Sequence, residues 1–82
     1  MKHERITVDP HIMVGKPVIK GTRITVEQLL RKLGAGMSIE QILDAHPHLS
    51  PDDIYAAAAY AADVVANEDV FLNEPDDAVS GW

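Results

Sequence analysis

The side chains in this sequence that could do chemistry are four histidines and thirteen carboxylates, with no cysteine to act as a nucleophile or thiolate ligand. His46 and His48 flank Pro47, which is not the spacing of two metal ligands on a helix or strand. Asp52 and Asp53 are neighbours, and neighbouring helix positions diverge, so they are a poor catalytic pair. No nucleophile, base and orienting group can be assembled. We therefore expect no catalytic residue, metal or cofactor, and a protein that is not an enzyme.

Phosphate or partner binding is the chemistry that remains, and residues 15–25 (GKPVIKGTRIT) are the candidate segment. The segment lacks the residue order of a P-loop, yet its backbone is constrained, because Gly15 and Gly21 can adopt positive φ and Pro17 fixes its own φ. We expect four of its side chains to contact DNA: Lys16, Lys20, Thr22 and Arg23. The alternative is a structural turn whose basic side chains are only solvated.

The charges of the chain are divided between its two parts. All seven Lys and Arg residues lie in the first 32 positions, together with three acids, for a net charge of +4. The remaining 50 residues carry ten acids and neither Lys nor Arg, for a net charge of −10. This asymmetry predicts two different partners or a head-to-tail contact, and it argues against a uniformly basic nucleic-acid-binding surface.

Eighty-two residues form one domain with a small core, which favours stabilisation by oligomerisation. The absence of cysteine fits a cytoplasmic protein. No apolar run approaches the roughly 20 residues that span a bilayer, and none resembles a leader sequence, so we expect no membrane association.

The elements that must position these residues form a single domain over residues 1–67. Two or three short strands are expected within residues 5–25, where β-branched residues lie between turn signals. Capping boxes at Thr25-x-x-Gln28 and Ser38-x-x-Gln41 predict helices over about 26–34 and 39–46. Leu49, a Ser50 cap and the following proline predict a third helix over 51–67.

The third predicted helix is apolar on two sides, which is typical of a helix buried on two sides. One stripe, which should meet the first two helices, comprises Ile54, Ala57, Ala58, Ala61, Val64 and Val65. The other stripe has no obvious partner within so short a chain and comprises Tyr55, Ala59, Ala62 and Ala66. We therefore expect a subunit or partner interface on this second stripe.

Residues 68–82 form an acidic C-terminal tail with five carboxylates and no helical or strand periodicity. One interpretation is an unstructured tail. However, this segment contains the single Phe and the single Trp of the chain, which favours a ligand that folds on binding, anchored by Phe71, Leu72 and Trp82.

Three short helices joined by tight turns predict a mainly α fold of the helix-turn-helix type, with a small N-terminal β element and a dimeric assembly. The last two helices would be the DNA-reading pair, but they would present Asp52 and Asp53 to phosphates. If this fold contacts DNA, the basic segment 15–25 is the better candidate.

The Lys-Pro-x-Ile-x-Gly-Thr-Arg core of residues 16–23 resembles the family called domain of unknown function 433, and the resemblance covers roughly residues 5–65. It implies a homeodomain-like or winged-helix-like fold. Some members of the family are antitoxins of type II toxin–antitoxin pairs whose partner is a PIN-like ribonuclease, and the resemblance implies that role here. A separate hypothesis is autoregulation by binding operator DNA through Lys16, Lys20 and Arg23. Val14 stands where the family often has glycine, and His46 where it often has tyrosine. The alternative function is a dimeric interaction scaffold with no nucleic-acid role.

Overall fold

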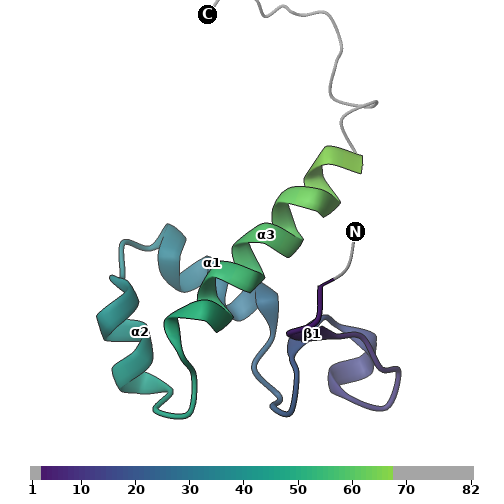
Figure 1. Ribbon diagram of the computed structural model, residues 1–82, viewed down its shortest axis with the longest axis horizontal. Helices are drawn as coiled ribbons and strands as arrows, with labels where there is room; N and C mark the ends of the chain where they lie inside the picture. The colour runs from purple at the N-terminus through teal and green to yellow at the C-terminus, as the bar shows by residue number, and fades with distance from the viewer. Residues whose placement is uncertain (1–2, 68–82) are drawn as a thin grey trace, which may run out of the picture.

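A computed structural model of the chain describes residues 3–67. Two short strands and a one-turn segment precede three helices (Figure 1). Their bounds are β1 (Ile6–Thr7), η1 (Met13–Gly15), β2 (Val18–Ile19), α1 (Val26–Gly34), α2 (Ile39–Ala45) and α3 (Pro51–Asn67). The predicted mainly α architecture with a small N-terminal sheet is confirmed, and the helix-turn-helix type is consistent with it.

The helices begin and end where side chains and glycine satisfy their terminal backbone groups. Thr25 Oγ1 accepts a hydrogen bond from the Gln28 amide at 2.9 Å, and Ser38 and Gln41 form a complete capping box. Helix α1 ends through Gly36, whose φ of 94° lets the Met37 amide donate to the Lys32 carbonyl at 3.1 Å. Helix α2 stops at Ala45, one residue earlier than expected, because His46 is its C-cap.

The small sheet consists of β1 and β2, which pair antiparallel with Ile6 opposite Ile19. An isolated bridge between Val18 and Thr25 continues it to the start of α1. Two strands within residues 5–25 agree with the prediction of two or three, and residues 13–15 between them form the turn η1 and not a third strand. η1 has three successive positive φ angles, of 49°, 54° and 83° at Met13, Val14 and Gly15, and such a left-handed turn cannot pair as a strand.

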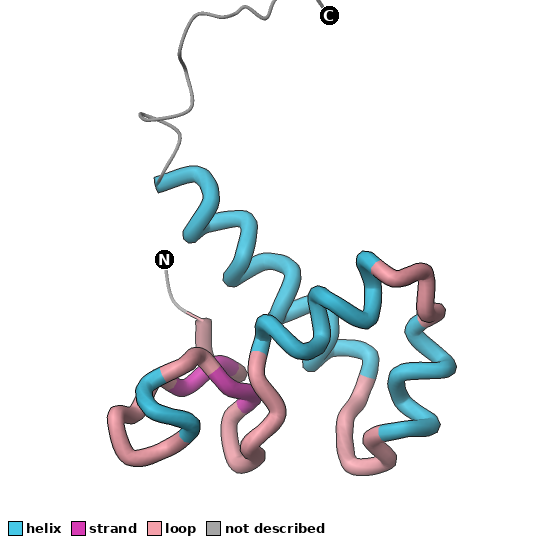
Figure 2. Tube along the Cα trace, turned by 180° about the vertical axis from the view of Figure 1, so that it is seen from behind, coloured by secondary structure: helices cyan, strands magenta, loops and turns pink. Residues whose placement is uncertain are grey.

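One core holds the sheet against the three helices, and its buried members are Ile19, Val26, Leu29, Ile42, Leu49, Ile54 and Ala57. Leu49 and Ile54, expected to meet across the start of α3, are both in it. Within α3, all the buried residues lie in the first seven positions. The C-terminal half of the helix projects from the body of the domain (Figures 1 and 2).

The prediction that the whole apolar stripe of α3 meets the first two helices is wrong for the projecting half of the helix. Ala58 is exposed, and Val64 and Val65 are 40% and 56% exposed, so the stripe meets α1 and α2 only in its first half. The reason is length: α3 has 17 residues against nine in α1 and seven in α2. At about 1.5 Å per residue, the shorter helices cannot cover all of the longer one.

Candidate functional site

The basic loop of residues 20–23 is a tight turn between β2 and the start of α1. The Ile19 amide donates to the Ile24 carbonyl at 2.9 Å, and the Thr22 amide donates to the Ile19 carbonyl at 2.9 Å. The Thr22 hydroxyl donates to the same carbonyl at 2.8 Å and accepts from the Ile24 amide at 3.0 Å. Gly21 has a φ of 82°, which the turn requires and glycine adopts without strain. The Thr22 hydroxyl therefore donates its hydrogen bond within the loop itself.

The four predicted DNA-contacting residues differ in their electrostatic surroundings. Lys16 Nζ lies 3.1 Å from Glu27 Oε1, so its charge is compensated. Lys20 and Arg23 are exposed, and neither forms an ion pair with another residue in the described range 3–67. These two side chains are the basic groups of the loop that remain available to an anionic ligand.

Glu27 on α1 accepts hydrogen bonds from two basic side chains, Lys16 just before β2 and Arg31 on the same helix. Its second carboxylate oxygen accepts from Arg31 Nε at 3.0 Å, while its first accepts from Lys16. The hydrogen bond from Arg31, then that from Lys16, lowers the pKa of Glu27 below its ordinary value. Glu27 therefore stays ionised under all but strongly acidic conditions and keeps Lys16 against α1.

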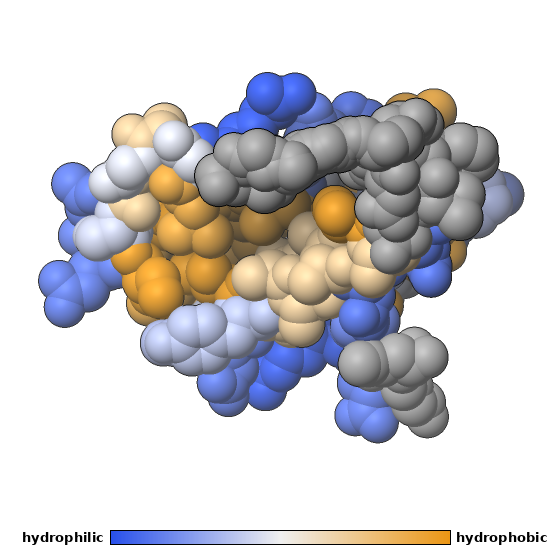
Figure 3. Space-filling model, turned by 90° about the horizontal axis from the view of Figure 1, so that it is seen from above, coloured by the Kyte–Doolittle hydropathy of each residue, from blue (hydrophilic) through white to orange (hydrophobic). Residues whose placement is uncertain are grey.

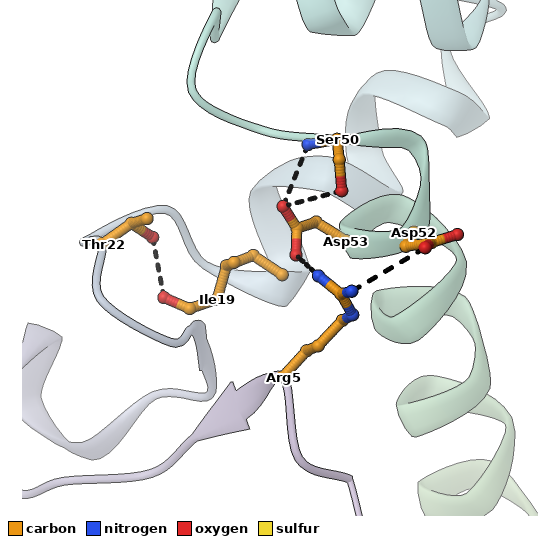
Figure 4. A network of polar contacts seen from close by, with 6 residues as sticks. All are labelled: Arg5, Ile19, Thr22, Ser50, Asp52 and Asp53. Carbon is orange, nitrogen blue, oxygen red and sulfur yellow. Dashed lines mark hydrogen bonds and ion pairs between the residues drawn. The ribbon is translucent and has the colours of Figure 1, made fainter.

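A polar network fixes the loop relative to the start of α3 (Figure 4). Asp53 is 9% exposed, accepts from the Ser50 amide at 3.0 Å and also accepts from Arg5 Nη1 at 2.9 Å. Asp52 lies 3.7 Å from the same guanidinium group. The Arg5 carbonyl in turn accepts from the Lys20 amide at 2.8 Å. One chain of contacts thus runs from the α3 N-terminus to the basic loop.

Sequence reasoning missed the role of Arg5 and Asp53. Asp53 lies in the first turn of the predicted third helix, where any carboxylate is favourable, and no sequence pattern pairs it with a residue 48 positions earlier. The detectable signal was the spacing Ser50-x-x-Asp53, in which a carboxylate at the third helical position reaches back to the capping residue.

The basic loop and the turn between α2 and α3 lie at the same edge of the molecule. Both views show these segments together, away from the end toward which α3 projects (Figures 1 and 2). Next to the loop is a hollow of about 440 Å³ lined by residues that include Thr7, Ile12, Gly21 and Arg23. This edge combines the available basic groups with the turn that leads into the N-terminus of α3.

The predicted partner stripe on α3 is exposed along its length. Tyr55 is 57% exposed, and Ala59, Ala62 and Ala66 are exposed too, on the side of α3 opposite its buried residues. The other predicted partner contacts, Phe71, Leu72 and Trp82, lie outside the described residues. Among residues 3–67 no group of three or more His, Cys, Asp or Glu side chains could hold a metal ion.

The sequence profile of the family described as "Protein of unknown function (DUF433)" matches residues 6–61. The chain belongs to this family. A crystal structure of a DUF433 member from Anabaena variabilis ATCC 29413 superposes with a TM-score of 0.72 at 26% identity, covering 85% of this chain and 69% of the other. The resemblance found in the sequence is confirmed at the level of the family and of this three-helix fold.

Two uncharacterised proteins are also similar in sequence. The protein y4eO of Sinorhizobium fredii is 40% identical over 58 residues, which is 71% of this chain and 26% of the relative. A protein of Archaeoglobus fulgidus is 64% identical over 28 residues, which is 34% of this chain and 78% of the relative. The chain thus spans about a quarter of the rhizobial relative.

No helix in the described part of the chain is both long and apolar enough to cross a membrane.

Proposed function

We propose that this DUF433 protein is an antitoxin-like component of a type II toxin–antitoxin pair, which neutralises a PIN-like ribonuclease in the cytoplasm and binds its own operator. The observation that carries the proposal is the separation of surfaces. Lys20 and Arg23 are available at one edge, while α3 presents an exposed apolar stripe and leads into five acidic residues. The DNA and the toxin would then use different parts of one small domain.

The carboxylates Asp52 and Asp53 at the start of α3 would repel DNA phosphates at this edge, and their contacts with Arg5 weaken that repulsion. Asp53 is turned inward, where it caps α3 and pairs with Arg5, and Asp52 lies near the same guanidinium group. The three side chains together carry one net negative charge instead of the two that the carboxylates alone would present. Lys20 and Arg23 can then contact phosphates on the flank of the α3 N-terminus.

A mobility-shift titration with the DNA upstream of the gene tests the operator role. We expect Lys20→Ala and Arg23→Ala each to weaken binding and to reduce the slope of log affinity against log salt by about 1. Lys32→Ala is the matched control, because Lys32 also lacks an ion pair with a described residue but lies on α1. Undiminished binding by Arg23→Ala would refute the loop as the contact.

Toxin binding is assigned to the stripe Tyr55, Ala59 and Ala62 together with Phe71, Leu72 and Trp82. The five acids of residues 68–82 complement a basic RNA-binding groove, and the large apolar side chains supply anchors. Co-purification with the protein encoded next to this gene is the test. Deleting residues 68–82 should abolish capture, and Ala59→Arg should weaken it without unfolding the domain. Capture that survives the deletion would disprove the role of the tail.

A second candidate is a dimeric interaction scaffold without a nucleic-acid role. The net charge of −6 and the carboxylates Glu40 and Asp52 on the two candidate reading helices favour it. The mobility-shift assay separates the two functions: no shift at low salt, with or without the neighbouring protein, would support the scaffold.

A further inference from the structure

The apolar groove between α1 and the projecting half of α3 has no role in the functions proposed above. It has a volume of about 300 Å³, and its lining includes Val26, Leu30, Tyr60, Ala61, Val64 and Val65. Apolar side chains of the described residues also gather on the face of the molecule seen in Figure 3. The groove continues the core-facing side of α3 beyond the point where α1 and α2 stop covering it.

We propose that this groove is a homodimer interface, in which the C-terminal half of α3 from each of two copies lies in the groove of the other. The shape favours a second copy, because the helix that forms one wall of the groove on one copy is the projecting element that can fill it on the other. Such a contact is isologous, so a single two-fold axis buries both grooves and leaves none open. The small side chain of Ala61 lets the two helix backbones approach closely.

The charges around the groove also favour α3 of a second copy as its occupant. Its rim carries Glu27 and Arg31, the two charged residues that line it, and Lys16 pairs with the same Glu27, so the three side chains together carry a net charge of +1. The last turn of α3 contains no basic residue, so its free carbonyl groups and helix dipole are uncompensated within the described chain. Placing the end of one α3 against the rim of the other groove brings these opposite charges together.

The contact that this groove can make is small, because the groove on each copy has a volume of about 300 Å³. The two-fold axis buries both grooves at once, and α3 forms one wall of each groove as well as the element that fills the other. A small interface predicts a reversible, concentration-dependent dimer.

This interface differs from the stripe predicted from sequence. Tyr55, Ala59 and Ala62 lie on the opposite side of α3 and remain exposed in the dimer, where a different protein can bind them. The inference gives an interface to the dimeric assembly predicted from the sequence and does not depend on DNA binding. Its test uses the purified full chain without DNA or toxin, so the antitoxin function can fail while the dimer stands.

Sedimentation equilibrium of the full chain from about 1 to 200 µM, with Val65→Glu and Val8→Glu as a matched pair, tests the interface. Both valines are 56% exposed, but only Val65 lines the groove. We expect Val65→Glu to weaken dimerisation at least about 100-fold, because each copy would bury a carboxylate, and Val8→Glu to leave it unchanged. Circular dichroism spectra of both variants establish that they fold.

Cysteine crosslinking supplies a second measurement, since the chain has no cysteine of its own. Under mild oxidation, Ala61→Cys should form a covalent dimer and Val8→Cys should not. A chain that is monomeric at every concentration overturns the proposal. So does a dimer that resists Val65→Glu but is lost in Ala62→Glu, which would place the interface on the opposite stripe.

The tail of the same chain is the competing occupant, and the single tryptophan, Trp82, reports on it. If the wild-type chain is monomeric and its Trp82 emission shifts to the red in Val65→Glu but not in Val8→Glu, the tail fills the groove. That result overturns the dimer. A dimeric wild type whose Trp82 emission is the same in both variants supports it.

Discussion

Val14 is the residue whose backbone departs most from its ordinary preference. It adopts a φ of 54°, in the left-handed region that β-branched residues avoid, and its side chain is 90% exposed. No packing of the side chain therefore compensates for the strain. Glycine is the residue that adopts such a conformation freely.

Replacing Val14 with glycine should stabilise the protein. The left-handed conformation costs an L-residue about 1–2 kcal/mol, and the extra flexibility of unfolded glycine returns about 0.5–1 kcal/mol of that. We expect a net gain of about 0.5–1 kcal/mol in the free energy of unfolding of Val14→Gly, measured by urea denaturation. Val8→Gly, at an exposed valine without positive φ, should lose stability instead. A loss in both variants would show that Val14 is not strained.

Asp53 is the carboxylate of the described residues whose removal should cost the most. Asp53→Ala deletes the hydrogen bond to the Ser50 amide and leaves Arg5 without its close partner, at a cost of about 1–3 kcal/mol. Asp52→Ala should cost less than about 0.5 kcal/mol, because Asp52 is largely exposed and 3.7 Å from Arg5. Thermal unfolding of both variants compares them, and equal losses would contradict the assignment.

At the scale of elements, Glu27 couples α1 to the segment between η1 and β2 through Lys16. If Lys16 contacts phosphate, Glu27→Gln should release it and tighten operator binding by about three- to tenfold, with a steeper salt dependence. Gln28→Ala, a change on the next, exposed position of α1, is the control. Unchanged binding by Glu27→Gln would restrict the phosphate contacts to Lys20 and Arg23.

The Glu27 carboxylate also makes the stability of the protein depend on pH, and the direction of this dependence can be predicted. The pKa of Glu27 is lower in the folded than in the unfolded chain, so its contribution to stability is present above its unfolded pKa and is lost as the pH falls through the folded one. We expect the stability difference between the wild type and Glu27→Gln to shrink between about pH 5 and pH 3. Urea denaturation at the two ends of this range measures it, and a constant difference would contradict the coupling.

At the scale of the whole molecule, a small core supports a helix that extends beyond it. A domain as small as residues 1–67 buries a limited fraction of its surface, and here the second half of α3 contributes to the groove instead of the core. If a second copy covers that half, the midpoint of thermal unfolding should rise with protein concentration between about 1 and 200 µM. Val65→Glu should remove this dependence, whereas a concentration-independent wild type would argue against the dimer.

The uneven distribution of charge along the chain supports two separate proposed binding surfaces. The first 32 residues carry +4, residues 33–67 carry −5 and residues 68–82 carry −5, which sum to the net −6. Nucleic acid is therefore expected at the edge that holds the basic loop, and a basic protein partner at the opposite end of α3.

The sequence by itself determined the features that depend on residues close to one another in the chain. The starts of α1 and α2 follow from Thr25 and Ser38, and the end of α1 follows from Gly36, because caps act within one helical turn. The family also followed from a short contiguous motif, Gly-Thr-Arg with its flanks. These features need no knowledge of how the elements pack.

Only the tertiary structure decided which basic side chains remain available and which side of α3 is open. Lys16 and Arg5 are engaged by Glu27 and Asp53, residues 11 and 48 positions away, and no periodicity contains such pairs. Val64 and Val65 belong to an apolar stripe in the sequence but are exposed, because α1 and α2 end before they can cover them. Burial depends on the lengths and placement of neighbouring elements, which the pattern along a single helix does not record.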